Sequence, residues 1–293
     1  MINMANYPEK VYINGEIVPH QEAQISVFDR GFLFGDGIYE VMVQIGDDFF
    51  YGKEHLDRLT SCLKKINLNF DVSILPKEIE KLLEVSELKD KDCLVYIQVT
   101  RGVAIRKHAF PKTATPTIVM YAIPFTLPQI NQNSIAAITI EDNRWHRCDI
   151  KAISLLGNVM ANDHAAAQGM YESIFIRNGR ITEASHCNVF FVKNNIVYTH
   201  PADTYILDGI TRQIVIQLCK KLQIEVREEA ILEEHLTTMD EAFLSGTTTQ
   251  IASISKIDHH AYSEDGSIGP IVKRLQQAFL ELKEKHKGNT INM

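Results

Sequence analysis

The hydrophobic positions of this 293-residue chain recur at two different intervals, which predict helices and strands. In EHLDRLTSCLKKINL the apolar residues Leu56, Leu59, Leu63 and Ile66 recur at helical spacing, so this run predicts an amphipathic helix. The runs CLVYIQVTRG and TPTIVMYAI are rich in β-branched and aromatic residues, which favour strands. The first part of the chain is therefore expected to combine helix and sheet.

Three pairs of turn residues separate short β-prone runs and predict β-hairpins. Asn14-Gly15 in VYINGEIV is the strongest of these short-range signals and predicts a type I′ turn. Two further hairpins are predicted around Asn178-Gly179 in SIFIRNGRITEAS and around Asn194-Asn195 in CNVFFVKNNIVYTH. We expect each pair to form the tip of its hairpin.

The second part of the chain shows the same mixture. SIAAITIE predicts a strand, and DEAFLSGTTTQIASISKI predicts a strand, a polar turn and a second strand. ISLLGNVMANDHAAAQG predicts a helix with Ser154 as N-cap and Gly169 as its C-terminal stop. GITRQIVIQLCKKLQI predicts another helix. Its apolar face carries Ile214, Val215, Leu218 and Leu222.

A break between the two parts occurs at PFTLPQINQN, which has two prolines, several amides and no periodicity. A chain of this length suits two domains of ordinary size. We predict a small N-terminal α/β domain at residues 1–123, an interdomain linker at 124–133 and a larger C-terminal domain at 134–293. The expected fold class is α+β, with two mixed α/β domains.

The composition restricts the partners. A formal net charge of −7 argues against a nucleic-acid binder or a membrane-surface protein, because both usually present a basic face. The N-terminal MINMANYPEK has no apolar core of a signal peptide, and no apolar run approaches the roughly 20 residues of a membrane span. The five cysteines are odd in number, scattered and never spaced C-x-x-C, which is typical of free thiols in a reducing cytosol. We predict a cytoplasmic protein that acts on small molecules.

Two charged residues have a functional and an ordinary interpretation. Lys151 lies in RCDIKAISLLGN, between an Asp-Ile step and small and apolar residues, yet most lysines are solvated surface charges. Glu183 lies at the end of a hairpin strand in GRITEASHCN, where a carboxylate is usually solvated. If Glu183 turns inward it needs a partner, because a buried unpaired carboxylate is costly. A protonated ring nitrogen would be such a partner.

Two segments could bind a phosphate. In LDGITRQIV a helix that begins at Ile210-Thr211 leaves backbone N–H groups free at the positive end of its dipole. The alternative is an ordinary helix start with Thr211 as N-cap. LSGTTTQ is a hydroxyl-rich turn after a strand, which could supply further phosphate donors or be an ordinary polar turn.

The loop TRGVAIRKHAFP could trap an anion. It contains Arg101, Arg106, Lys107 and His108, and in extended backbone Arg106 and His108 could point the same way. The alternative is a solvated turn.

The sequence lacks the motifs of three other classes of site. FGDGIYEV has no third glycine for a dinucleotide, no G-x-S-x-G is present, and no histidine pair has metal-binding spacing, so no metal site is predicted.

Taken together, a lysine, a carboxylate and phosphate donors at a helix start are what pyridoxal phosphate (PLP) requires. PLP forms a Schiff base with a lysine, and an acidic residue keeps its pyridine nitrogen protonated. The order of the motifs resembles that of the class IV (fold type IV) PLP-dependent aminotransferases, and within them the D-amino acid enzymes. The resemblance runs from the first hairpin to about Ile257. It rests on DRGFLFGDGIYEV, EHLDRL, VTRGVAIRKHAFP, EDNRWHRCDIKAISLLGNV, GRITEASHCNVF, THPADTYILDGITRQ and LSGTTTQI.

The resemblance implies a role for each matching residue. Lys151 matches the Schiff-base lysine, and Glu183 matches the carboxylate that faces the pyridine nitrogen. The phosphate-binding positions match Arg58, the backbone of Ile210 and Thr211, and the Thr247 hydroxyl. Leu207 matches a residue packed against the cofactor ring, and Arg144 matches an arginine close to the site. Tyr39, Arg106 and His108 match the residues that bind the substrate α-carboxylate. The resemblance also implies a homodimer with active sites at the domain interface, where Arg106 and His108 reach over from the neighbouring subunit.

The Arg-x-His pair of IRKHAFP favours a D-amino acid enzyme that transfers the amino group of D-alanine to 2-oxoglutarate. Branched-chain aminotransferases and aminodeoxychorismate lyases generally lack this pair, and both are alternatives on the same fold. A non-catalytic PLP or phospho-ligand binding protein and an unrelated two-domain α/β binding module are further alternatives. The chain departs from its nearest relatives at Ser185-His186-Cys187 and at Gly246, both of which could alter the side-chain pocket.

Overall fold

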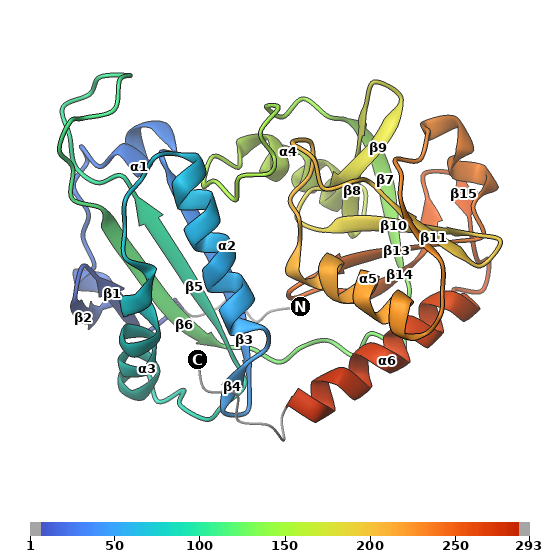
Figure 1. Ribbon diagram of the computed structural model, residues 1–293, viewed down its shortest axis with the longest axis horizontal. Helices are drawn as coiled ribbons and strands as arrows, with labels where there is room; N and C mark the ends of the chain where they lie inside the picture. Colours follow the sequence, from blue (N-terminus) through green and yellow to red (C-terminus); the bar gives the residue numbers. More distant parts are fainter. Residues whose placement is uncertain (1–6, 287–293) are drawn as a thin grey trace. The chain divides into compact units, whose positions relative to one another are not determined.

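The computed structural model describes residues 7–286 (Figure 1). The first six residues of MINMANYPEK, on which the expectation of no signal peptide partly rests, lie outside them. The described chain divides into two compact units. One falls within Met1–Thr126, Ile150–Ser154 and Lys285–Met293, and the other comprises Leu127–Asp149 and Leu155–Glu284.

The first unit is built on a six-stranded antiparallel sheet in the order β2-β1-β6-β5-β3-β4. Its strands are β1 (Lys10–Ile13), β2 (Glu16–Pro19), β3 (Gly37–Ile45), β4 (Asp48–Phe49), β5 (Cys93–Thr100) and β6 (Thr117–Pro124). Its helices are α1 (Arg30–Phe34), α2 (Gly52–Lys65), α3 (Leu75–Val85) and the 3₁₀ turns His20–Glu22 and Val72–Ile74. The apolar faces of α2 and α3 pack with the sheet in one core, because their buried leucines recur at helical spacing.

The second unit is built on a nine-stranded mixed sheet in the order β12-β11-β10-β13-β14-β7-β8-β9, with β15 paired to β14. Its strands are β7 (Ile135–Glu141), β8 (Glu172–Arg177), β9 (Arg180–Ala184), β10 (Asn188–Lys193), β11 (Ile196–Thr199), β12 (Val226–Glu228), β13 (Glu241–Gly246), β14 (Gln250–Ile257) and β15 (His260–Ala261). Helices α4 (Leu156–Ala167), α5 (Ile210–Lys221) and α6 (Pro270–His286) and the 3₁₀ turn Glu233–Thr238 complete the list. The sheet curls, since β9 at one end of the order also contacts β10. No helix among residues 7–286 has both the length and the apolarity needed to cross a bilayer.

The three predicted hairpins are confirmed. Asn14 and Gly15 have φ angles of +50° and +104°, Asn178 and Gly179 of +51° and +69°, and Asn194 and Asn195 of +50° and +64°. These angles belong to the left-handed region that two-residue turns need, and asparagine and glycine adopt it at low cost. Each hairpin is therefore encoded within a few residues of sequence.

The predicted helices and strands are present, and PFTLPQINQN forms no helix or strand beyond the last residue of β6. One prediction about a helix end is wrong. α4 begins at Leu156 with Leu155 as its N-cap, and the Ser154 hydroxyl donates instead to the carbonyl of Gly35 (2.9 Å). The predicted start of α5 at Ile210 is confirmed, and its N-cap is Gly209, so the alternative with Thr211 as N-cap does not hold. Helices α3 and α6 were not predicted from the sequence.

Candidate active site

Lys151 lies in a short segment that pairs with the N-terminal end of β3. Ala152 forms an isolated bridge with Ile38, and the Lys151 carbonyl accepts a hydrogen bond from the Tyr39 N–H (3.1 Å). The side chain crosses the ring of Tyr39, with Nζ 4.1 Å from the ring centroid. Tyr39 in turn stacks on Tyr96. The backbone of β3 therefore sets the position of the Lys151 amine.

Arg58 is held in place by a buried carboxylate on the neighbouring strand. Its Nε donates to Oε1 of Glu40 (2.7 Å), and its terminal nitrogen donates to Oε2 (3.0 Å). His55, one turn earlier on α2, bonds through Nδ1 to the same Oε2 (2.8 Å). Burial opposes ionisation, but Arg58 and His55 hold the pKa of Glu40 well below its usual range. Glu40 is thus an anion that orients the predicted phosphate-binding arginine.

Replacing Glu40 with glutamine is expected to destabilise the protein by about 3–5 kcal/mol, because a buried pair loses one charge and leaves Arg58 without its counter-ion. The free energy of unfolding, measured by urea titration, tests this expectation. Asp57→Asn on α2, the helix that carries Arg58, is the matched control, since the ion pair of Asp57 with Lys53 is exposed and should contribute little. Equal losses in the two variants would contradict a structural role for the Glu40–Arg58 pair.

The predicted carboxylate-binding loop is exposed in this chain. Arg106 and His108 both lie against the ring of Phe34, at centroid distances of 5.1 and 5.7 Å. The guanidinium of Arg30 donates to the carbonyls of Lys107 (2.6 Å) and His108 (3.4 Å), which holds the loop backbone. Arg101 does not belong to this exposed group, because it is buried and pairs with Asp36 (2.8 Å).

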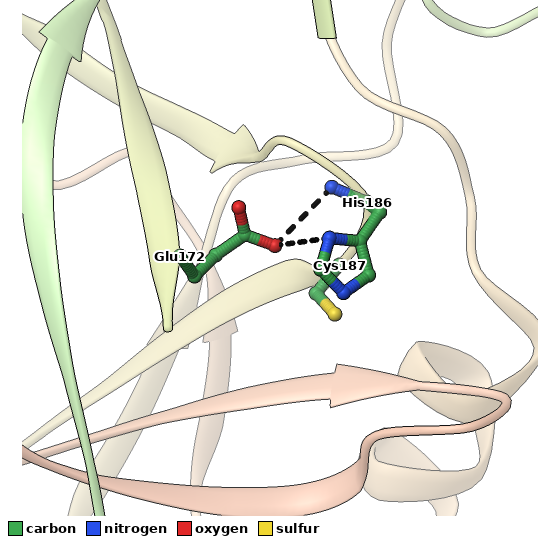
Figure 2. A group of neighbouring side chains, drawn as sticks. All are labelled: Glu172, His186 and Cys187. Atoms are coloured by element: carbon green, nitrogen blue, oxygen red, sulfur yellow. Dashed lines mark hydrogen bonds and ion pairs between the residues drawn. The ribbon is translucent and has the colours of Figure 1, made fainter. Parts of the chain in front are cut away.

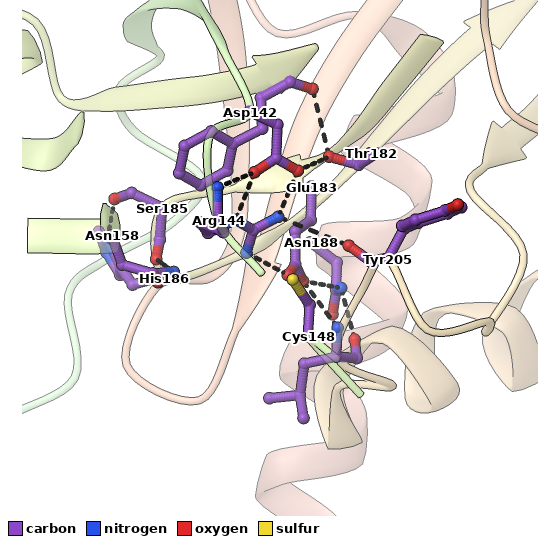
Figure 3. Close-up of polar contacts among 12 residues, drawn as sticks. Asp142, Arg144, Cys148, Asn158, Thr182, Glu183, Ser185, His186, Asn188 and Tyr205 are labelled. Atoms are coloured by element: carbon purple, nitrogen blue, oxygen red, sulfur yellow. Dashed lines mark hydrogen bonds and ion pairs between the residues drawn. The ribbon is translucent and has the colours of Figure 1, made fainter. Parts of the chain in front are cut away.

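Glu183 is buried at the end of β9, so the interpretation of a solvated strand-end charge is wrong. Figure 3 shows its carboxylate beside Arg144, whose guanidinium donates to Oε1 (2.7 Å). Oε2 accepts from the backbone N–H of Leu207 (3.0 Å) and from the side-chain amide of Asn188 (3.2 Å). Burial outweighs these interactions and raises the pKa of Glu183 to about 7. An additional cationic donor would favour the ionised form.

Arg144 is itself fixed by a second buried carboxylate. Its Nε donates to Asp142 (2.9 Å), and Arg177 donates to the same carboxylate (3.1 Å). Thr182 completes the group with a hydroxyl donation to Asp142 (3.3 Å). Burial opposes the charge, but the two arginines keep the pKa of Asp142 below its usual range. The network leaves Arg144 with one donor for Glu183 and little freedom to move.

The two predicted phosphate-binding segments also lie in the second unit. α5 begins at Gly209, which has no side chain to cap the N–H groups of the first turn. Thr247 is half-buried in the turn between β13 and β14. Leu207 precedes the helix, and its backbone bonds on both sides: its N–H donates to Glu183, and its carbonyl accepts from Asn188 (2.8 Å). The start of α5 is therefore tied to the Glu183 carboxylate.

The predicted site residues fall into two groups, one in each unit. Lys151, Tyr39 and Arg58 belong to the first unit, with Arg106 and His108 on its exposed loop. Glu183, Arg144, Leu207, Ile210, Thr211 and Thr247 belong to the second. Sequence reasoning missed the residues that orient them, which are Glu40, His55, Asp142 and Asn188. No local pattern distinguishes these from other polar residues, because their roles depend on burial and on how their side chains are directed in the folded chain.

Comparisons with known proteins identify the family and the fold. Residues 37–257 match the family model described as amino-transferase class IV. D-alanine aminotransferase of Staphylococcus aureus is 37% identical over 95% of this chain and 99% of its own length, and that of Bacillus licheniformis is 38% identical over 92% and 95%. The structure of the branched-chain amino acid aminotransferase of Escherichia coli superposes with a TM-score of 0.85 at 26% identity, over 94% of this chain and 95% of that one. The expected mixed α/β fold is confirmed, and the chain belongs to the class IV aminotransferases.

Proposed function

We propose that this protein is a PLP-dependent D-amino acid aminotransferase that converts D-alanine and 2-oxoglutarate to pyruvate and D-glutamate. The observation that carries the proposal is the buried Glu183 carboxylate, which has a pKa near neutrality and is joined to the uncapped start of α5. The choice of D-amino acids is supported by relatives named D-alanine aminotransferase, which match nearly the whole chain.

The residues fit PLP in their chemistry. A pyridinium N–H needs a buried anion, and Glu183 has acceptor capacity left beyond its three present donors. A phosphate needs backbone N–H groups and fixed positive charge, which the start of α5 and Arg58 supply. Ile210, Thr211 and Thr247 would complete the proposed phosphate set, and Leu207 would contact the ring. Lys151 supplies the amine that binds the aldehyde.

PLP supplies an aldehyde and an electron-accepting ring when bound. The protein residues orient the cofactor and transfer the protons. Glu183 holds a proton on the ring nitrogen, while Arg144 and Asn188 hold Glu183 in position. Lys151 Nζ removes the Cα proton of the amino acid and later returns a proton, one base serving both halves of the reaction. The Tyr39 ring lies against the Lys151 side chain, with its centroid 4.1 Å from Nζ.

Arg106, His108 and Tyr39 bind the substrate α-carboxylate, and this decides for which enantiomer the Cα hydrogen faces Lys151. The Arg106–His108 pair distinguishes the proposed enzyme from a branched-chain aminotransferase or an aminodeoxychorismate lyase. Initial rates on matched D- and L-alanine, and on L-leucine, with 2-oxoglutarate as acceptor, test the proposal. A preference for L-leucine, or pyruvate release from aminodeoxychorismate without an acceptor, would replace it by one of those alternatives.

Arg106→Ala is expected to weaken binding of the transition state by about 2–5 kcal/mol, because a bound carboxylate loses its charged partner. The loss should appear as a lower kcat/KM for D-alanine. PLP content, measured by absorbance of the purified protein, should stay unchanged. Lys107→Ala is the matched control, since Lys107 is an exposed basic residue next to Arg106. Loss of PLP from the Arg106 variant would mean that Arg106 belongs to the cofactor site instead.

The enzyme is a cytoplasmic homodimer in which Arg106 and His108 serve the neighbouring subunit. Support for a dimer comes from large apolar side chains that are exposed in the single chain, which commonly mark interfaces. On α4 these are Leu156, Val159 and Met160, and in the first unit they include Val27, Phe28, Phe32, Ile105 and Phe110. Support for the cytoplasm comes from the odd number and scattered positions of the cysteines. Neither nucleic acid nor membrane is a partner.

A further inference from the structure

A second group of reactive side chains lies where β8 begins and where β9 leads into β10. Glu172, His186 and Cys187 offer a carboxylate oxygen, a ring nitrogen and a sulfur, all within 4.8 Å of one another (Figure 2). Among residues 7–286, no other set of three His, Cys, Asp or Glu side chains brings its ligand atoms this close. The proposed aminotransferase reaction assigns no role to these three side chains.

Glu172 is oriented so that one oxygen faces the other two residues. The residue has no solvent exposure, and its Oε1 accepts from the Ser173 N–H (2.8 Å) and from the Ser185 hydroxyl. Oε2 is directed to His186, where it lies 2.6 Å from Nδ1 and accepts from the backbone N–H (3.3 Å), with a lone pair left for an ion. Carboxylates that bind metals are commonly held by hydrogen bonds of this kind. The anchored Oε1 leaves Oε2 as the coordinating atom.

The sulfur and the imidazole complete the set. Cys187 is buried, and its Sγ lies 3.2 Å from the Thr249 hydroxyl oxygen. It also faces Gly246, where a Cβ atom would lie only 3.1 Å from the sulfur, so the glycine keeps this side open. The His186 side chain is 46% exposed, which gives an ion a route from solvent. A buried thiol, a buried carboxylate and an accessible imidazole thus converge.

We infer that Glu172 Oε2, a ring nitrogen of His186 and Cys187 Sγ bind a thiophilic divalent cation, with Zn²⁺ as the best match, and leave a fourth position for water. This mixed N, O and S donor set is typical of zinc, and three protein ligands plus an open position characterise its accessible sites. The inference goes beyond the proposed function and does not depend on it. The sequence suggested no metal site, because residue 172 is brought to 186 and 187 only by the β8–β9 hairpin.

Binding requires a small rearrangement. In a tetrahedral zinc site with bonds of about 2.0–2.3 Å, ligand atoms stand roughly 3.3–3.8 Å apart. The Nδ1 of His186 must therefore move away from Oε2, which its half-exposed side chain allows. The ion takes the place of the thiol proton and of the proton between His186 and Glu172, and both protons pass to solvent.

Titration of the holoenzyme with Co²⁺, followed by displacement with Zn²⁺, tests the inference. One equivalent of Co²⁺ should give the absorption of a four-coordinate ion together with a sulfur-to-metal charge-transfer band, and Zn²⁺ should abolish both. Cys187→Ser should remove the charge-transfer band, and His186→Ala should weaken binding at least tenfold. Cys219→Ser, which changes a buried cysteine on α5, should leave the spectrum unchanged.

The readout needs no transamination, so a failed activity assay and a failed metal titration are separate results. PLP absorbance of each variant shows that it is folded and loaded. A charge-transfer band that survives in Cys187→Ser, no sulfur band in the unmodified holoenzyme, or equal affinity in His186→Ala would each overturn the site. Glu172→Gln adds a third ligand test, with an expected loss of affinity of the same order as that of His186→Ala.

Discussion

Replacing Lys151 with alanine is expected to abolish turnover of D-alanine and 2-oxoglutarate and to remove the visible absorption of lysine-bound PLP. The amine has two tasks in the proposed reaction, since it binds the aldehyde and transfers the Cα proton, and among residues 7–286 no other lysine lies over Tyr39. Loss of a general base alone lowers rates by about 10²–10⁴-fold. Loss of both tasks should therefore leave activity at the detection limit of a coupled pyruvate assay.

Two measurements separate this result from misfolding. Borohydride reduction of the unmodified enzyme followed by peptide mapping should place the pyridoxyl label on the peptide that contains Lys151. Addition of a small primary amine should restore part of the proton transfer in the alanine variant, because the cavity left by the side chain can hold it. A label on another residue, or normal turnover without Lys151, would show that the assignment is wrong.

Replacing Glu183 with glutamine is expected to lower kcat by about 10²–10³-fold, the scale on which one preorganised charged group contributes to catalysis. A neutral amide cannot hold a proton on the pyridine nitrogen, so the ring accepts electrons less readily. Steady-state kinetics with saturating PLP measure the loss. Asn188→Ala is a useful comparison, because it removes one donor to Glu183 and leaves the carboxylate in place. A Gln variant with full activity would exclude Glu183 as the ring partner.

Glu183 should also make the free energy of unfolding of the PLP-free protein depend on pH. Its pKa is raised by burial from an ordinary 4.5 to about 7 in the fold, so between these values the folded state binds the extra proton. The free energy of unfolding should therefore fall as pH rises through this window, by an amount on the order of 3 kcal/mol. Urea titrations at pH 5 and pH 8 should show this fall in the free energy of unfolding. In Glu183→Gln the contribution of Glu183 to the fall should be absent.

Local sequence determined the elements whose formation needs only near neighbours. The Asn14-Gly15, Asn178-Gly179 and Asn194-Asn195 turns could be predicted because two residues suffice to set their backbone angles. α2 could be predicted from the spacing of its leucines, because one face of a helix is a local property. The family could be identified because its motifs occur in order along the chain.

Tertiary structure alone decided how the charged residues are paired. Ser154 could not be excluded as a helix cap from its sequence, because its partner Gly35 lies in a distant segment. The Glu183–Arg144 and Glu40–Arg58 ion pairs likewise join residues from separate segments of the chain, and the burial of Glu183 follows from the fold around it. The free energy of a carboxylate depends on desolvation and on nearby charges, and both are properties of the folded chain that no local pattern records.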